Sequence, residues 1–245
     1  MNPLWLAWQE AVGTPEEDSL REQAIARFAF AVPDDAALDA IRVASPRGVV
    51  EIGAGTGYWA HLLHDHGVDV VAYDPAPAPS PENRWFAESP AWFAVTAADH
   101  TSVEAHAERT LLLVWPTRNE DWAADAVGRF AAAGGTTLAY AGEPTGGRTG
   151  DDRFHALIGE IDRCWACAYR ITTAPCVCGT TPLFERVRTI ELPRWTGYDD
   201  DLRIYVRTYD VAPLRPEGRG ARLLGWRNAG GGLVSRARHR RRHQG

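Results

Sequence analysis

The stretch that decides the fold is Val49-Val50-Glu51-Ile52-Gly53-Ala54-Gly55-Thr56-Gly57-Tyr58-Trp59. A short apolar run with an acid leads into three glycines, and a helical pattern of apolar residues follows them. This order predicts a β-strand, a tight turn and the first turn of an α-helix. Glycine has no Cβ and tolerates positive φ, so such a turn lets the backbone approach a ligand closely. The sequence therefore predicts a ligand site at residues 53–57.

The spacing of these glycines is Gly-x-Gly-x-Gly. A dinucleotide-binding turn has the spacing Gly-x-Gly-x-x-Gly, and its third glycine lies where helix and strand pack closely. In this chain Tyr58 occupies that third position. The difference argues against a nicotinamide or flavin cofactor and favours another nucleotide-like ligand.

A second acid supports this interpretation. The segment from Asp69 to Asp74 has the pattern of another strand that ends in a carboxylate, and Asp74 follows Gly53 by 21 positions. An acid ~20 residues after the glycine turn commonly binds ribose hydroxyls. A carboxylate suits a ribose because it only accepts hydrogen bonds, and both hydroxyls can donate to it. The alternative is an ordinary strand–turn–helix unit followed by an aspartate at a strand end.

On these residues the chain resembles the class I S-adenosylmethionine-dependent methyltransferases. Residues Glu51 to Gly57 match the first motif of that family and Asp74 matches the second, while Asp99 and the pair Gly134-Gly135 are weaker matches. The resemblance covers roughly residues 28 to 208. It implies that the glycine turn passes under the methionine and ribose of the cofactor, that Asp74 binds the ribose and that Asp99 meets the adenine.

The resemblance thus gives a set of expected S-adenosylmethionine-binding residues. They are Glu51, Gly53, Ala54, Gly55, Gly57, Tyr58, Asp74, Pro75, Asp99 and Trp115. The segments 27–33 and 111–116 also resemble a bacterial methyltransferase-like subgroup.

Apolar patterns along the chain alternate between strand and helix periods. Strands are predicted near 49–52, 69–74, 92–95, 110–115, 136–141, 184–191 and 202–208, and helices near 58–66, 102–108, 120–132 and 152–163. This alternation predicts an α/β fold with a doubly wound, Rossmann-like seven-stranded sheet, closed by an antiparallel pair as in class I methyltransferases. The ligand should bind at the carboxyl ends of the parallel strands.

Three helices are predicted before the first strand. The first covers residues 4–12, Thr14-Pro15-Glu16-Glu17 has the pattern of a capping box that begins the second, and Pro33-Asp34-Asp35 begins the third. In this fold such an extension either covers the cofactor and helps to form the substrate pocket, or covers one face of the sheet.

Length and composition bound the organisation of the chain. A chain of 245 residues that is 45% hydrophobic suits one α/β domain with additions. We expect a helical extension at 1–46, a methyltransferase domain at 47–210 with a cysteine-rich insertion at 164–182, and a tail at 211–245. No apolar run approaches the ~20 residues of a membrane helix. The N-terminus lacks the pattern of a signal peptide, so a cytoplasmic location is expected.

Charge is unevenly distributed along the chain. From Arg215 onward there are nine arginines and one acid, a charge of +8, whereas the other 214 residues have 17 arginines and 31 acids, a charge of −14. An acidic body argues against a broad nucleic-acid surface. The Arg- and Gly-rich composition predicts a disordered tail, which is either a solvated end or a contact for RNA or an acidic partner.

The end of the fourth predicted strand is the usual place for acceptor contacts, and here it consists of Val114-Trp115-Pro116. Enzymes that methylate amino groups of nucleic acids often have Asp/Asn-Pro-Pro-Tyr at this point. Trp115 cannot accept from an amino group as the first residue of that motif does, so the sequence disfavours nucleobase N-methylation. Trp115 either stacks on a planar ligand or caps the sheet.

A polar loop at residues 142–152 follows the fifth predicted strand. Glu143 is the candidate catalytic residue, as a general base or substrate anchor. Asp151 either shares that role or caps the helix that follows.

All four cysteines lie close together, as Cys164, Cys167, Cys176 and Cys178. Clustered cysteine pairs in a reducing compartment favour a structural zinc site, although the Cys-x-Cys half is tighter than the usual knuckle, and free or redox-active thiols are the alternative. His61, His64 and His66 follow the glycine turn, and solvent-facing side chains are a simpler explanation for them than a metal site.

Other enzyme classes lack support in the sequence. The chain has no Gly-x-Ser-x-Gly elbow, and without any lysine it cannot form a Gly-Lys-Ser/Thr phosphate loop. The sequence therefore predicts an S-adenosylmethionine-dependent methyltransferase acting on a small molecule or a peptide, without a membrane partner. The alternatives are a catalytically inactive binding protein with a nucleotide fold, and an RNA methyltransferase that uses the basic tail.

Overall fold

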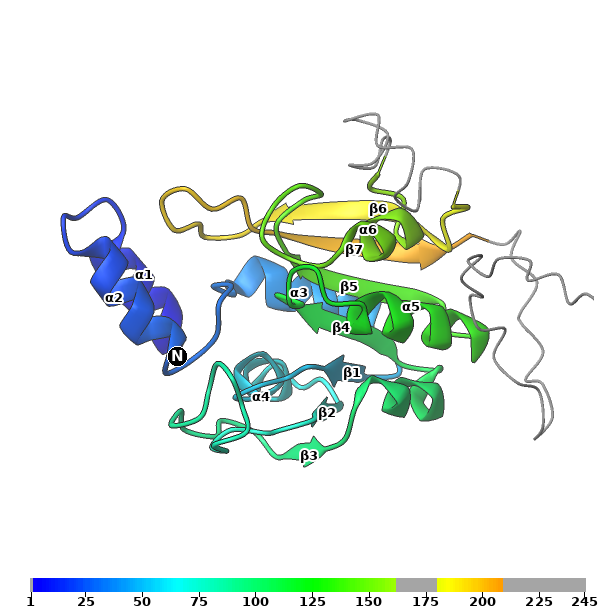
Figure 1. Cartoon of the computed structure of the whole chain (residues 1–245), viewed down its shortest axis with the longest axis horizontal. Helices are drawn as coiled ribbons and strands as arrows, with labels where there is room; N and C mark the ends of the chain where they lie inside the picture. The colour runs from blue at the N-terminus through cyan, green and yellow to red at the C-terminus, as the bar shows by residue number, and fades with distance from the viewer. Residues whose placement is uncertain (1, 162–179, 209–245) are drawn as a thin grey trace, which may run out of the picture. The chain divides into compact units, whose positions relative to one another are not determined.

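The computed structural model describes residues 2–161 and 180–208 (Figure 1). Three helices precede the first strand, as the sequence predicts. They are α1 (Pro3–Ala11), α2 (Glu17–Ile25) and α3 (Asp35–Ala44). Side chains of Asn2 and Asp34 cap α1 and α3 by accepting from backbone N–H groups in the first turn of each helix.

The centre of the fold is one sheet of seven strands in the order β3-β2-β1-β4-β5-β7-β6. The strands are β1 (Val49–Ile52), β2 (Val70–Asp74), β3 (Val95–Ala97), β4 (Thr110–Val114), β5 (Thr137–Gly142), β6 (Phe184–Glu191) and β7 (Asp201–Arg207). The first five strands pair in parallel, and β7 runs antiparallel to both β5 and β6. This arrangement confirms the predicted doubly wound sheet with its closing antiparallel pair.

Helices cover both faces of the sheet (Figure 1). The later ones are α4 (Tyr58–Asp65), the 3-10 helix η1 (His100–His106), α5 (Trp122–Ala132) and α6 (Asp152–Leu157). Val49 and Leu112 pack in one buried cluster with residues of α3 and α4, whereas Val50 and Leu111 pack in another with α5 and α6. Neighbouring residues on each strand therefore face opposite layers, as the two-residue period of a strand requires.

The third strand lies later in the chain than the sequence predicts. Residues 92–95 were expected to form it, but β3 begins at Val95. The backbone N–H of Trp92 donates to the Thr56 carbonyl at 2.8 Å, and its indole N–H donates to the Arg27 carbonyl at 2.7 Å. Trp92 is therefore held against the glycine turn and the α2–α3 connection. The apolar pattern before β3 arises from this packing and does not indicate a strand.

Two predicted helices differ from the structure in form or length. The helix expected at 102–108 is the 3-10 helix η1, which begins at His100. The helix expected at 152–163 begins where predicted but ends at Leu157, because Gly159 adopts a left-handed conformation with φ of 72°.

The predicted capping box before α2 is wrong. Instead of accepting a hydrogen bond from the helix, the Thr14 hydroxyl donates to the Ala11 carbonyl, at 2.6 Å. The Glu17 carboxylate reaches back to the N–H of Gly13 at 2.7 Å and accepts from the N–H and hydroxyl of Thr196. Glu17 therefore joins the α1–α2 turn to the loop between β6 and β7.

Gly57, in the glycine turn, gives a stability prediction with a matched control. Its φ is 73°, and a Cβ would lie 2.8 Å from Cβ of Phe93, whereas Gly67 has a φ of 79° and nothing within 4 Å. We expect Gly67→Ala to cost about 1–2 kcal/mol of unfolding free energy, the penalty for a left-handed L-residue. Gly57→Ala should cost about 1–3 kcal/mol more, because overpacking adds to that penalty. Urea denaturation measures both changes, and equal costs would contradict this packing.

Candidate functional site

A cavity of about 500 Å³ lies at the carboxyl ends of β1, β2 and β4. Five of the residues expected to bind the cofactor line it, namely Gly53, Asp74, Pro75, Asp99 and Trp115. The other candidates, Glu51, Ala54, Gly55, Gly57, Tyr58 and Glu143, are not part of its wall. The cavity therefore lies where open α/β sheets bind ligands, and its volume falls in the range of roughly 300–1,000 Å³ that is usual for small-molecule sites.

The glycine turn is bonded to the end of β2. The N–H groups of Gly53 and Ala54 donate to the Tyr73 carbonyl at 2.8 and 3.0 Å. The N–H of Gly55 donates to Oδ2 of Asp74 at 2.9 Å. Because β1 and β2 are neighbours in the sheet, these bonds hold the turn and the Asp74 carboxylate together at one edge of the cavity.

Asp74 is buried, yet it is one of the residues that line the cavity. Oδ2 accepts from Gly55, and Oδ1 accepts from the N–H of Ala76 at 2.9 Å. A carboxylate oxygen has two lone pairs, so each oxygen can accept one further hydrogen bond. Two donors on neighbouring ligand atoms, such as the hydroxyls of a ribose, would meet an acceptor already fixed in place.

Glu51 lies within β1, behind the wall of the cavity. Its side chain is buried, and Oε2 has no hydrogen-bond partner among the described residues. Burial raises the pKa of Glu51 to about 8, a backbone hydrogen bond from Ala60 opposes the shift, and the nearby charge of Asp74 adds to it. Below that pKa the carboxyl is neutral, and it accepts the hydrogen bond from the backbone of Ala60 in the first turn of α4.

The raised pKa of Glu51 predicts a pH dependence of stability. The pKa is about 8 in the folded chain against an ordinary 4.5, so the folded state holds the proton more tightly. This contribution is complete below the ordinary pKa and is lost as pH rises through about 8, at up to ~1.4 kcal/mol per pH unit. Glu51→Gln should flatten the fall of unfolding free energy between pH 6 and 8. The exposed control Glu22→Gln should keep the wild-type slope, and identical slopes for all three proteins would refute the prediction.

The side chain of Tyr58 faces the N-terminal helix. Its hydroxyl donates to Oδ1 of Asn2 at 2.8 Å and accepts from the N–H of Leu4 at 3.2 Å. The ring packs against those of Phe28 and Trp92 at centroid distances of 5.1 and 5.2 Å. The position that differs from a dinucleotide fingerprint is thus used to attach α1 to the start of α4.

Trp115 follows β4 and has a backbone conformation that is unusual for a side chain of its size. Its φ is 49°, in the left-handed region. The indole N–H donates to Oδ1 of Asp200 at 2.7 Å, and the ring stacks on Phe30 at 4.9 Å with an interplanar angle of 8°. Burial raises the pKa of Asp200 to about 7, although the hydrogen bond from Trp115 opposes the shift. The hydrogen bond and the stacking hold Trp115 in a strained backbone conformation at the cavity wall, and such strained residues are common at binding sites.

Four aromatic residues that the sequence reasoning did not single out also line the cavity. They are Phe30, Trp85, Phe86 and Trp122. A Cβ on Gly53 would lie 2.8 Å from the Trp122 ring, and one on Gly55 would lie 2.7 Å from the Phe86 ring. Because Gly53 and Gly55 have no Cβ, they leave room for the rings of Trp122 and Phe86. The pair Trp85-Phe86, in the long connection between β2 and β3, is the signal in the sequence that could have revealed two of them.

Asp99 lines the cavity, but its carboxylate is used locally. It accepts from the N–H and the hydroxyl of Thr101 at 2.9 and 2.6 Å, and so caps η1. These hydrogen bonds lower its pKa. The side chain is exposed, so it can still accept from a ligand at the β2–β3 end of the cavity.

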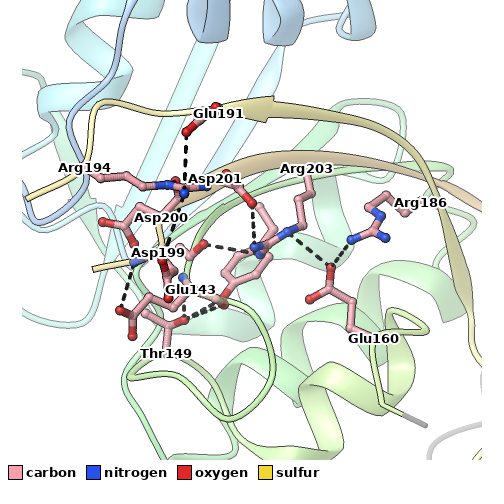
Figure 2. Close-up of polar contacts among 12 residues, drawn as sticks. Glu143, Thr149, Glu160, Arg186, Glu191, Arg194, Asp199, Asp200, Asp201 and Arg203 are labelled. Atoms are coloured by element: carbon pink, nitrogen blue, oxygen red, sulfur yellow. Dashed lines mark hydrogen bonds and ion pairs between the residues drawn. The ribbon is translucent and has the colours of Figure 1, made fainter. Parts of the chain in front are cut away.

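Glu143 is buried at the end of β5. Its carboxylate accepts from the Arg148 side chain and backbone N–H at 2.6 and 2.5 Å. It also accepts from the N–H of Asp199 at 3.3 Å (Figure 2). Arg148, unlike Glu143, lines the cavity. The candidate base thus holds an arginine at the cavity wall. Asp151 caps α6 by accepting from the N–H of Phe154 at 2.7 Å, the structural alternative predicted for it.

Residues 2–161 and 180–208 contain no group of three or more His, Cys, Asp or Glu placed to hold a metal ion. The predicted zinc ligands Cys164, Cys167, Cys176 and Cys178 lie outside the described residues, as does the basic tail. Within the described part of the chain, no helix is long and apolar enough to cross a membrane.

A sheet in the order 3-2-1-4-5-7-6 with β7 antiparallel, preceded by helices, defines the fold. It is the class I methyltransferase fold. No protein-family model matches the chain, and no curated protein does either.

Solved structures give distant matches. The magnesium protoporphyrin IX methyltransferase of Synechocystis PCC 6803, with bound S-adenosylmethionine, is 12% identical with a TM-score of 0.44, over 83% of this chain and 91% of that one. The 1,6-didemethyltoxoflavin-N1-methyltransferase of Burkholderia thailandensis, with bound 1,6-didemethyltoxoflavin and S-adenosylhomocysteine, is 16% identical with a TM-score of 0.41, over 71% of this chain and 80% of that one. Strand order and orientation, and not these similarities, identify the fold.

Proposed function

We propose that the protein is an S-adenosylmethionine-dependent methyltransferase that acts on a small-molecule or peptide acceptor. The observation that carries the proposal is Asp74, which two backbone N–H groups fix in place at the cavity wall beside the glycine turn. An acceptor-only group in this position fits a ribose diol.

The charges around the cavity also fit this cofactor. Asp74, Glu82 and Asp99 line the cavity near β2 and β3, with Arg84 as the basic residue in the same part of the wall. S-adenosylmethionine has a sulfonium and an ammonium group against one carboxylate, so it has a net positive charge and acidic surroundings favour it. In this proposal the exposed Asp99 would accept a hydrogen bond from the adenine amino group, and Asp74 would hold the ribose.

Methyl transfer requires alignment more than it requires acid or base chemistry. The acceptor lone pair forms the new bond to the methyl carbon while the carbon–sulfur bond breaks. The electron pair of the broken carbon–sulfur bond stays on sulfur, and the sulfonium becomes a neutral thioether. Any proton on the acceptor atom leaves to solvent. Alignment of the two reactants can supply several orders of magnitude in rate. The residues of this chain would therefore act by binding, orienting and excluding water, with the aromatic wall around Trp115 as the main contributor.

Calorimetric titration with S-adenosylmethionine and S-adenosylhomocysteine tests the proposal. We expect one molecule of either to bind per chain with micromolar affinity. Absence of binding by both to the folded protein would overturn the proposal. Binding without methyl transfer to any acceptor would instead favour the inactive binding protein.

A further inference from the structure

Two loops meet at the acceptor end of the cavity, one after β4 and one after β5. An antiparallel bridge pairs Thr117 with Thr149, and the N–H of Gly150 donates to the Pro116 carbonyl at 2.9 Å. Arg118 directly follows Thr117 and Arg148 directly precedes Thr149, so the bridge brings together the two loops that carry these arginines. Both arginines line the cavity.

The two guanidinium groups differ in their partners. Arg148 is paired with Glu143 at 2.6 Å, donates to the Gly197 carbonyl at 2.9 Å and lies over the Tyr198 ring at 4.2 Å. Arg118 makes no hydrogen bond, ion pair or ring contact with any residue in the part of the chain that the structure describes.

Arg21 does not line the cavity, but it adds positive charge near Arg148. Its guanidinium lies 3.9 Å from the centroid of Tyr198, the ring over which Arg148 also lies. Burial lowers the pKa of Arg21, as does the charge of Arg148, while Tyr198 and Asp200 oppose the shift. Positive charge therefore gathers near this end of the cavity, where Glu143 compensates Arg148 and Arg118 has no acidic partner among the described residues.

The wall beside these arginines is flat and aromatic. Trp115 stacks on Phe30, contacts Tyr198 at 6.0 Å between ring centroids and is fixed by its hydrogen bond to Asp200. A rigid indole favours a ligand with a planar π-system.

We propose that the acceptor is a planar aromatic carboxylate, with its ring against Trp115 and its carboxylate on Arg118 and Arg148. This inference rests on the proposed methyltransferase function, since it names the substrate class of the same cavity. Arginine suits the role because its planar fork matches a carboxylate with two parallel hydrogen bonds.

Binding of matched probes tests the proposal on the full-length protein. 2-Naphthoate and 2-naphthamide share a ring system but differ in charge. They are titrated by calorimetry with and without saturating S-adenosylhomocysteine, alongside benzoate and quinoline-2-carboxylate. We expect 2-naphthoate to bind at least about tenfold more tightly than the amide, as a charge-assisted hydrogen bond predicts. Arg118→Gln should remove that preference and leave the affinity for S-adenosylhomocysteine within about twofold, since Arg118 is exposed and unpaired within the described structure.

Arg42→Gln is the control for net charge, because Arg42 is exposed on α3 and its ion pair within the described residues is with the neighbouring, exposed Asp39. It should leave every affinity unchanged. Equal binding of acid and amide overturns the proposal, as does the failure of all three acids to bind below about 1 mM, a weak affinity for a specific site. A loss of S-adenosylhomocysteine affinity in Arg118→Gln would assign the arginine to the cofactor carboxylate instead. Arg118-dependent binding of 2-naphthoate without any binding of S-adenosylhomocysteine would refute the methyltransferase function but keep the anion site.

Discussion

Replacing Asp74 with alanine is expected to lower the affinity for S-adenosylhomocysteine by about 100-fold or more. Two ribose hydroxyls would each lose a hydrogen bond to a charged acceptor, and such bonds contribute about 1.5–3 kcal/mol each. The same change releases the N–H groups of Gly55 and Ala76, which Asp74 now holds at 2.9 Å. Calorimetry measures the effect directly.

Two further variants separate binding from structure in this experiment. Asp74→Asn keeps the shape but places an amide donor near two backbone donors, so it should also bind poorly. Asp69→Ala removes an exposed acid just before β2, at the opposite end of that strand, where it pairs with Arg109 at 2.6 Å. It should leave the affinity within about twofold, as expected for a surface substitution. An Asp74→Ala protein that folds and binds like wild type would remove Asp74 from the site.

Replacing Arg203 with methionine is expected to cost about 3–5 kcal/mol of unfolding free energy. Arg203 is 2% exposed, and its Nε lies 3.4 Å from Oε1 of Glu160, whose side chain is 6% exposed (Figure 2). Burial raises the pKa of Glu160, but hydrogen bonds and charges from His155, Arg203 and Tyr205 outweigh it, so the net shift is downward and the group is charged. Removing Arg203 takes away the buried positive partner of Glu160 and leaves the exposed Arg186 as its arginine partner among the described residues, and breaking a buried pair in this way accounts for the size of the effect.

Arg186→Met is the matched control for this change. Arg186 contacts the same Glu160 oxygen at 3.3 Å, but its side chain is 53% exposed. An exposed pair contributes only about 0–1 kcal/mol, so the control should unfold near the wild-type urea midpoint. Equal costs for the two arginines would show that burial does not set the strength of this network.

Local signals in the sequence predict the part of the fold that carries the proposed function. The apolar run, the three glycines and the helical pattern around residues 49–59 form β1, the turn and α4, and Asp74 ends β2 as expected. Periodicity failed where apolar residues pack against loops, as at Trp92, because the sequence does not show which partner buries a side chain. The domain boundaries and the individual cofactor contacts stay predictions.

The acceptor end of the site depends on contacts between residues far apart in the chain. The hydrogen bond between Trp115 and Asp200 joins the end of β4 to the start of β7, and the bridge between Thr117 and Thr149 joins two loops. No spacing rule links such positions, since strand order and not sequence distance brings them together. Sequence reasoning therefore identified Trp115 but neither Asp200, which fixes it, nor Arg118 beside it.

A crystal structure of the protein grown with S-adenosylhomocysteine tests the central claim most directly. The measurement is the distance between the ribose hydroxyl oxygens and the Asp74 carboxylate oxygens. We predict density in the cavity with both hydroxyls within about 2.5–3.0 Å of Asp74, the range of O–H···O hydrogen bonds. Density for the ligand elsewhere, or a ribose that does not contact Asp74, would contradict the account.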